Sequence, residues 1–108
     1  MKTWKWMAGM RYTRPQYLNH HRVSEWEIEQ GCVFDEDCRP DWNDPATRGC
    51  LLDQVRRRHA AECWVEYRTG KGWRVVYPVG EETKVVITEW HGSEAEALLA
   101  ALEEMEDG

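Results

Sequence analysis

Cysteine and histidine side chains are the first candidates for chemistry in this sequence, because together they form most structural zinc sites. They are Cys32, Cys38, Cys50, Cys63, His20, His21, His59 and His91. A zinc site usually contains two cysteines about two to four residues apart. Five residues separate Cys32 from Cys38, and twelve separate Cys50 from Cys63. We therefore expect no metal site, with Cys50 and Cys63 as small core residues and the other two cysteines in or beside a loop.

Catalytic motifs are missing from the chain. Neither serine lies in a nucleophile-elbow context, and Ser93 is better explained as a helix cap. The sequence has no Walker loop, dinucleotide-binding glycine pattern or zinc-protease helix motif. His20 and His21 could form an acid–base pair with acidic neighbours, but tandem histidines are more often polar surface. We expect a protein that is not an enzyme and binds no cofactor.

Tryptophan is the most unusual component of the sequence, with seven in 108 residues. A single small core cannot easily bury seven indole rings, each with an N–H that needs a partner. Tryptophan, tyrosine and arginine dominate protein interfaces, and they also stack on nucleotides. The alternative is that the N-terminal strands, with Trp4 or Trp6, cover the second sheet face. The predicted partner-binding residues are Trp4, Trp6, Arg11, Tyr12, Trp26, Trp64, Trp73 and Arg74.

Charged residues occur in blocks along the chain, whose net charge is −6. Residues 1–24 carry five bases and no acid, and the following blocks 25–53, 54–74 and 75–108 carry net charges of −7, +4 and −8. Opposite blocks can neutralise one another, or separate acidic and basic faces can contact different partners. A duplex-binding domain usually has a pI above about 9, whereas this chain has a pI near 5.2. This argues against duplex nucleic acid as a partner.

The second half of the chain has clear signals for secondary structure. Asp44 is a suitable N-cap and Pro45 a suitable first residue for a helix that extends to His59. Ser93 and Glu96 form a capping box, which begins a C-terminal helix with a leucine-rich stripe. Between the helices, we predict strands over 63–68, 73–77 and 83–90, separated by turns over 69–72 and 79–82.

The first half of the chain has weaker signals. We predict strands over 3–7, 10–13 and 23–28, a short strand over 32–34, and an acidic loop over 35–44. These strands either extend the sheet of the second half or form a second small sheet. The expected fold is α+β, with an antiparallel sheet of about five to six strands and two helices packed on one face, in the order β-β-β-α-β-β-β-α. One domain over 1–108 is expected, made of N-terminal strands (1–34), the acidic loop (35–44) and a helix–three strands–helix segment (45–108).

The helix–three strands–helix order resembles the double-stranded RNA-binding domain, but Glu94 and Glu96 stand where that family has phosphate-binding lysines. A different resemblance rests on Trp6-Met7-Ala8-Gly9-Met10, Asp44-Pro45-Ala46-Thr47-Arg48-Gly49-Cys50-Leu51-Leu52 and Glu94-Ala95-Glu96-Ala97-Leu98. These segments are similar to small accessory proteins encoded by bacteriophages and prophages. The resemblance implies a viral protein in the host bacterial cytoplasm, and it implies no chemistry.

The sequence as a whole predicts a non-enzymatic phage accessory protein that binds and inhibits or modulates a host protein, including one of a defence system. The alternatives are a small-ligand or nucleotide-binding sponge, and a virion or assembly component. An exposed edge strand near Trp73 or Trp90 could also pair two copies in a homodimer. No apolar run is long enough for a membrane span, and the N-terminus has no signal-peptide core, so we expect no membrane partner.

Overall fold

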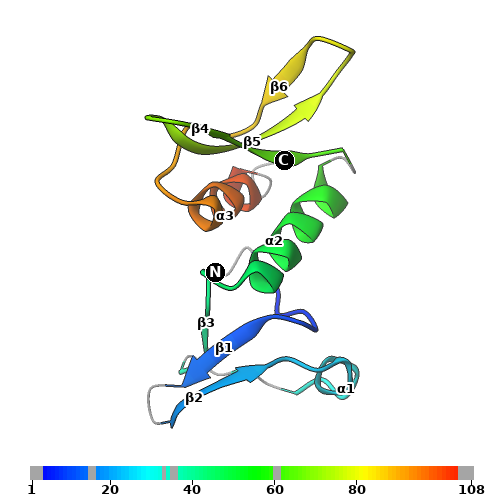
Figure 1. Ribbon diagram of the computed structural model, residues 1–108. Coiled ribbons are helices and arrows are strands. Elements are labelled where there is room, and N and C mark those ends of the chain that lie inside the picture. The colour runs from blue at the N-terminus through cyan, green and yellow to red at the C-terminus, as the bar shows by residue number, and fades with distance from the viewer. Residues whose placement is uncertain (1–3, 15–16, 33, 35–36, 60–61, 105–108) are drawn as a thin grey trace. The chain divides into compact units, whose positions relative to one another are not determined.

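The structure is a computed structural model that describes residues 4–14, 17–32, 34, 37–59 and 62–104 (Figure 1). The chain forms two compact units, which we call the N-terminal unit (Lys5–Cys50) and the C-terminal unit (Met1–Trp4 with Leu51–Gly108). In chain order the elements are β1 (Arg11–Arg14), β2 (Tyr17–Arg22), α1 (Glu25–Glu29), β3 (Arg39–Pro40), α2 (Pro45–Arg58), β4 (Trp64–Arg68), β5 (Gly72–Pro78), β6 (Lys84–Val86) and α3 (Glu94–Glu104).

The N-terminal unit contains a three-stranded antiparallel sheet in the order β2-β1-β3. Tyr12, at the centre of β1, is 7% exposed. Its ring lies 5.7 Å from the ring of Trp6 and 5.6 Å from that of Phe34, both edge-on. Trp6 in turn stacks on Phe34 at 5.0 Å. These three rings pack together, so Tyr12 and Trp6 help to hold this small unit together.

Several predictions for the first half of the chain are wrong. The predicted strand over 23–28 is instead helix α1, because Ser24 and Glu27 form a capping box in which each satisfies a backbone N–H of the other. The predicted acidic loop contains strand β3, in which Pro40 pairs with Tyr12. The predicted strands over 3–7 and 32–34 are not strands where the structure describes them, and Thr3 and Val33 lie outside the described residues.

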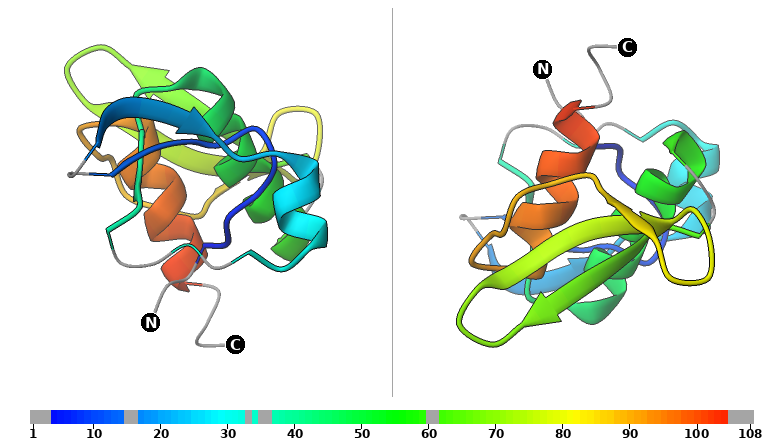
Figure 2. Two further views of the ribbon diagram at one scale, coloured as in Figure 1. Left: turned by 90° about the horizontal axis from the view of Figure 1, so that it is seen from below. Right: turned by 90° about the horizontal axis from the view of Figure 1, so that it is seen from above.

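The C-terminal unit contains a second three-stranded antiparallel sheet, in the order β4-β5-β6. Helix α3 packs against β5 and β4 (Figure 2). Its buried residues Leu98 and Leu102 form the core of this unit together with Val75 and Cys63. The predicted helix pair and the three predicted strands are confirmed, although the third strand ends earlier, at Val86. The predicted N-caps are also confirmed, since Asp44 accepts from the backbone N–H of Thr47 and Ser93 from that of Glu96.

The fold is α+β, as expected, but the prediction of one sheet with five to six strands is wrong. Two separate three-stranded sheets and three helices are present in the described part of the chain. The sheets are separate because β1 already has a neighbour on each side, β2 and β3, while β4, β5 and β6 pair only in sequence order. No helix within the described ranges is long and apolar enough to cross a membrane.

Candidate functional site

Exposed apolar side chains gather at the sheet of the C-terminal unit. Of the large hydrophobic residues that are exposed, five belong to this sheet and the turn after β5: Trp64, Tyr67, Val79, Val85 and Val86. The cross-strand register places Trp64 opposite Val76, and Val76 opposite Val86. Directly paired residues point to the same face of a sheet. Trp64, 37% exposed, and Val86, 46% exposed, therefore share one face, which we call the Trp64 face.

A cluster of charges lies on the Trp64 face. Glu66 stands opposite Arg74 in the register, with Arg74 Nη2 at 3.3 Å from Glu66 Oε1. Lys84 Nζ lies 2.7 Å from Glu66 Oε2, and Arg68 Nη2 lies 3.9 Å from Oε1. The hydrogen bond from Lys84, followed by that from Arg74, holds the pKa of Glu66 below its ordinary value. Three cations surround one carboxylate, so the cluster is net positive.

Arg74 also stacks on Trp90, with its guanidinium carbon 4.2 Å from the centre of the indole ring. This stack borders an open groove of about 590 Å³. The groove is lined by Arg74, Val86, Ile87, Thr88, Glu89, Trp90 and Glu104. Because Glu66 already pairs with Arg74, the carboxylates of Glu89 and Glu104 make the groove acidic. The site therefore combines apolar, aromatic and charged groups without a nucleophile held against a base.

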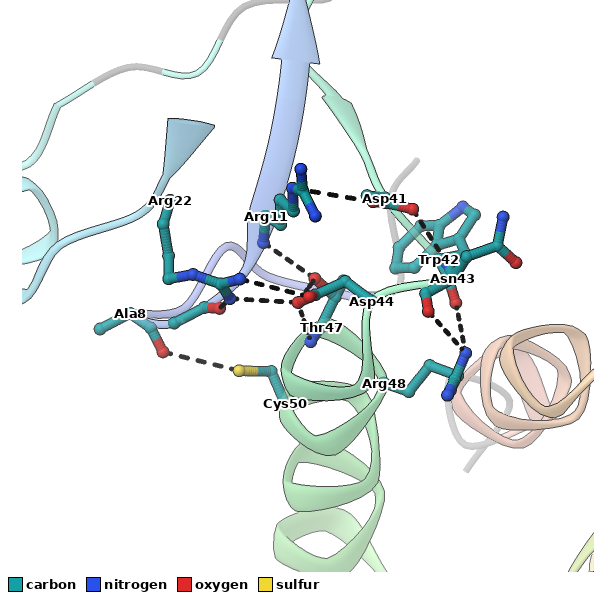
Figure 3. Close-up of polar contacts among 11 residues, drawn as sticks. Ala8, Arg11, Arg22, Asp41, Trp42, Asn43, Asp44, Thr47, Arg48 and Cys50 are labelled. Atoms are coloured by element: carbon teal, nitrogen blue, oxygen red, sulfur yellow. Dashed lines mark hydrogen bonds and ion pairs between the residues drawn. The ribbon is translucent and has the colours of Figure 1, made fainter. Parts of the chain in front are cut away.

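The N-terminal unit contains a connected polar network at the start of α2 (Figure 3). Asp44 Oδ2 accepts from the backbone N–H and hydroxyl of Thr47, at 3.0 and 2.9 Å. Arg22 donates to both carboxylate oxygens of Asp44, at 3.1 and 3.2 Å. The hydroxyl of Thr47 also accepts from the backbone N–H of Arg11 at 2.8 Å. This network joins the start of α2 to β1 and β2, which is a structural role.

Protonation of Asp44 is expected to weaken this network in acid. The hydrogen bond from Arg22, assisted by those from Thr47, lowers the pKa of Asp44 from 3.8 to about 2. A carboxyl whose pKa is depressed by folding stabilises the protein above its unfolded pKa and loses that contribution as the pH falls from about 4 to 2. Since Arg22 is half-exposed, we expect this loss to be about 1–2 kcal/mol. Urea unfolding of the wild type and of Asp44→Asn between pH 5 and 2 measures it.

The two proteins are compared by how steeply their free energy of unfolding changes with pH, because Asp44→Asn removes the titrating group. The wild type should lose its stability advantage over Asp44→Asn across this pH range. Parallel stability curves for the two proteins would show that the carboxylate of Asp44 titrates alike in the folded and unfolded states.

The predicted partner-binding residues are spread over both units. Trp64 and Arg74 share the Trp64 face, whereas the ring of Trp73 contacts that of Tyr67 at 4.8 Å. Trp26 is 64% exposed on α1. The others lie elsewhere: Trp4 is half-buried, Trp6 and Tyr12 belong to the aromatic cluster of the N-terminal unit, and Arg11 lies 3.9 Å from Asp41. None of the seven tryptophans is buried, so the prediction that they could not all lie in the interior is confirmed.

The cysteines follow the prediction in part. Cys63 is fully buried, as expected, and Cys32 is exposed, whereas Cys50 is only partly buried. Cys38 lies in the loop beside β3, as expected, but it is only 4% exposed, and its sulfur accepts a hydrogen bond from Arg14 Nε at 3.3 Å. The described ranges contain no group of three or more potential metal ligands.

The sequence-based prediction missed Val86, Trp90, Glu89 and Glu104 as lining residues of the groove. The predicted strand over 83–90 contained three of them, but which edge of a strand stays open depends on the sheet order, and the sequence carries no direct signal for it. No family model, curated protein or solved structure shows significant similarity to the chain.

Proposed function

We propose that this protein is a non-enzymatic phage accessory protein that binds, and thereby inhibits or modulates, a host protein. The observation that carries the proposal is the exposure of Trp64 and Val86 beside the charge cluster of Arg74, Lys84 and Glu66. Exposed apolar side chains beside charged groups are typical of protein interaction sites. The host context rests on the resemblance of short segments to phage proteins.

The residue types on this face suit a protein partner. Tryptophan and arginine are enriched among the residues that contribute most to binding between proteins. Arg74 is held by Glu66 and Trp90, so it loses little side-chain entropy when a partner binds. Lys84, with 40% of its side chain exposed, pairs with Glu66 and places charged groups at the polar rim of this face, where charges set the specificity of an encounter.

Replacement of Trp64 by glutamate should strongly weaken partner binding. The immobilised wild type should capture a specific host protein from a bacterial lysate at native salt, and the purified partner should bind Trp64→Glu at least about tenfold more weakly, as for a central interface tryptophan. The matched control is Trp26→Glu, which alters a more exposed tryptophan on α1 and should leave affinity unchanged. Affinity is measured by titration calorimetry.

Two results would contradict the proposal. One is the absence of any specific protein partner for the wild type. The other is equal affinity of a purified partner for wild type and Trp64→Glu, which would place the binding surface elsewhere.

A second candidate function, the binding of a nucleotide-like small ligand, is favoured by the groove. Its volume of about 590 Å³ lies within the range of about 300–1,000 Å³ that is usual for ligand pockets. Trp90 and Arg74 offer a stacking surface and a cation. A ligand at about 100 times its dissociation constant adds about 2.7 kcal/mol to stability. Thermal unfolding with a set of nucleotides would show this as a raised midpoint, and such a shift without a protein partner would favour the second function.

A further inference from the structure

Strand β6 forms an open edge of the C-terminal sheet. Among the residues that the structure describes it pairs with β5 alone, and all three of its own residues are exposed. Ile87 donates its backbone N–H to the carbonyl oxygen of Val75 at 2.9 Å. Because N–H groups alternate sides along a strand, the N–H and carbonyl of Val86 point away from β5. Val86 therefore presents a free donor and acceptor at the sheet edge.

The groups around this edge determine which kind of segment it can bind. The groove beside Val86 has apolar groups from Val86 and Ile87, the ring of Trp90, the guanidinium of Arg74 and the carboxylates of Glu89 and Glu104. Arg74, and Lys84 of β6, already pair with Glu66, so the two carboxylates outweigh the cations at this edge. Successive side chains of an added strand point to opposite faces. An added strand in which apolar and basic side chains alternate could thus place its apolar side chains against Val86 and Ile87. Its basic side chains could lie near the carboxylates of Glu89 and Glu104.

We propose that the open edge of β6 binds an extended segment of the partner protein as a fourth strand, and that in this segment apolar residues alternate with lysine or arginine. This inference rests on the proposed function and names the chemistry of the partner. Pairing along the backbone supplies affinity, and the side-chain groups of the groove supply selectivity, as in other cases of strand addition.

A second copy of the chain is a less suitable occupant of the same edge. Pairing β6 with its own copy about a two-fold axis would bring together two grooves that each carry Glu89 and Glu104. Like charges at an interface oppose association. Charge complementarity therefore favours a basic segment over self-association. Light scattering that shows a dimer, lost in a Val86→Pro variant, would overturn the inference.

The first test removes the outward N–H with the proline variant. Proline lacks the backbone donor, and Val86 does not use its N–H toward β5, so Val86→Pro should keep the sheet. The matched control is Val86→Thr, which keeps both the N–H and a β-branched side chain. The probe is an array of seven-residue peptides in which Lys or Arg alternates with Val, Ile, Leu or Phe. We expect Val86→Pro to bind at least about tenfold more weakly than wild type, and Val86→Thr within about twofold.

The second test addresses charge and does not alter the backbone. A matched array with Asp or Glu in place of the basic residues should bind wild type at least about tenfold more weakly. Glu89→Gln combined with Glu104→Gln should reduce the preference for the basic array by at least about threefold. Circular dichroism confirms that each variant is folded. A wild type that does not prefer the basic array, or equal binding by Val86→Pro and Val86→Thr, would overturn the inference.

Failure of this inference can be told apart from failure of the proposed function. A host protein that binds the wild type and Val86→Pro equally, but does not bind Trp64→Glu, would leave the proposed function standing and exclude the β6 edge. A wild type without any protein partner would exclude the proposed function itself.

Discussion

Replacing Gly72 by alanine is expected to destabilise the C-terminal unit by at least about 3 kcal/mol. Gly72 has a φ of +106°, which residues with a side chain rarely adopt. A Cβ atom at this position would lie 2.2 Å from the carbonyl oxygen of His91, a backbone atom that cannot rotate away. The expected loss therefore combines backbone strain with a steric clash. Urea unfolding followed by circular dichroism measures it.

Gly70→Ala is the matched control in the same turn. Gly70 has a φ of +81°, and a Cβ atom there would meet nothing within 4 Å. Only the strain of the left-handed backbone remains, which costs about 1–2 kcal/mol. The difference between the two variants isolates the close approach to His91. Equal losses for Gly70→Ala and Gly72→Ala would show that this approach does not constrain the folded chain.

The close approach of Gly72 to the backbone of His91 also affects the candidate site. The backbone of Trp73 exchanges two hydrogen bonds with that of His91, at 2.8 and 2.7 Å. This bridge holds the segment after β6 against β5, and Trp90 precedes His91 directly. Trp90 can therefore stack on Arg74 because the chain next to it is fixed. A glycine in a turn thus contributes to the geometry of a groove to which it does not itself belong.

The second half of the chain could be predicted because its signals are local. Asp44 and Ser93 cap helices within three residues of themselves, and Gly70 and Gly72 mark a turn between adjacent strands. Each contact joins residues that are close in sequence, so the residue types alone indicate it. The strands β4, β5 and β6 pair in chain order, which is the simplest topology.

The first half could not be predicted as well, for two different reasons. At Ser24 a signal was present, because Ser24 and Glu27 have capping-box spacing, but the alternation of Ser24, Trp26 and Ile28 suggested a strand. A helix of five residues is too short for periodicity to decide. At β3 no signal was present, because two residues that include Pro40 pair with a strand that is distant in sequence.

The candidate site could be predicted only in its residue types. The excess of tryptophan indicated that some indole rings would be exposed, and Trp64 and Trp26 are. Which of these rings lies beside an open sheet edge depends on strand order and register. Glu104 lines the groove although it is distant in sequence from the strands, so only the packing of α3 against the sheet brings it there.

Replacing Leu98 by alanine is the second change with a large expected effect. Leu98 is fully buried in α3, within the core of the C-terminal unit. Truncation removes apolar contacts and leaves a cavity that surrounding side chains fill only in part, which costs about 3–4 kcal/mol. A small protein has a total stability of only about 5–15 kcal/mol. We therefore expect a fall in the thermal midpoint of more than about 10 °C.

Leu99→Ala is the matched control, because it removes the same atoms from the next residue of the same helix. Leu99 is only partly buried, so less apolar surface returns to water and no closed cavity forms. We expect a loss of about 1–2 kcal/mol, well below that for Leu98→Ala. Helix propensity changes alike in both variants, so the difference reports burial alone. Equal losses would mean that α3 does not pack with Leu98 toward the sheet, and the position of Glu104 at the groove would then lose its support.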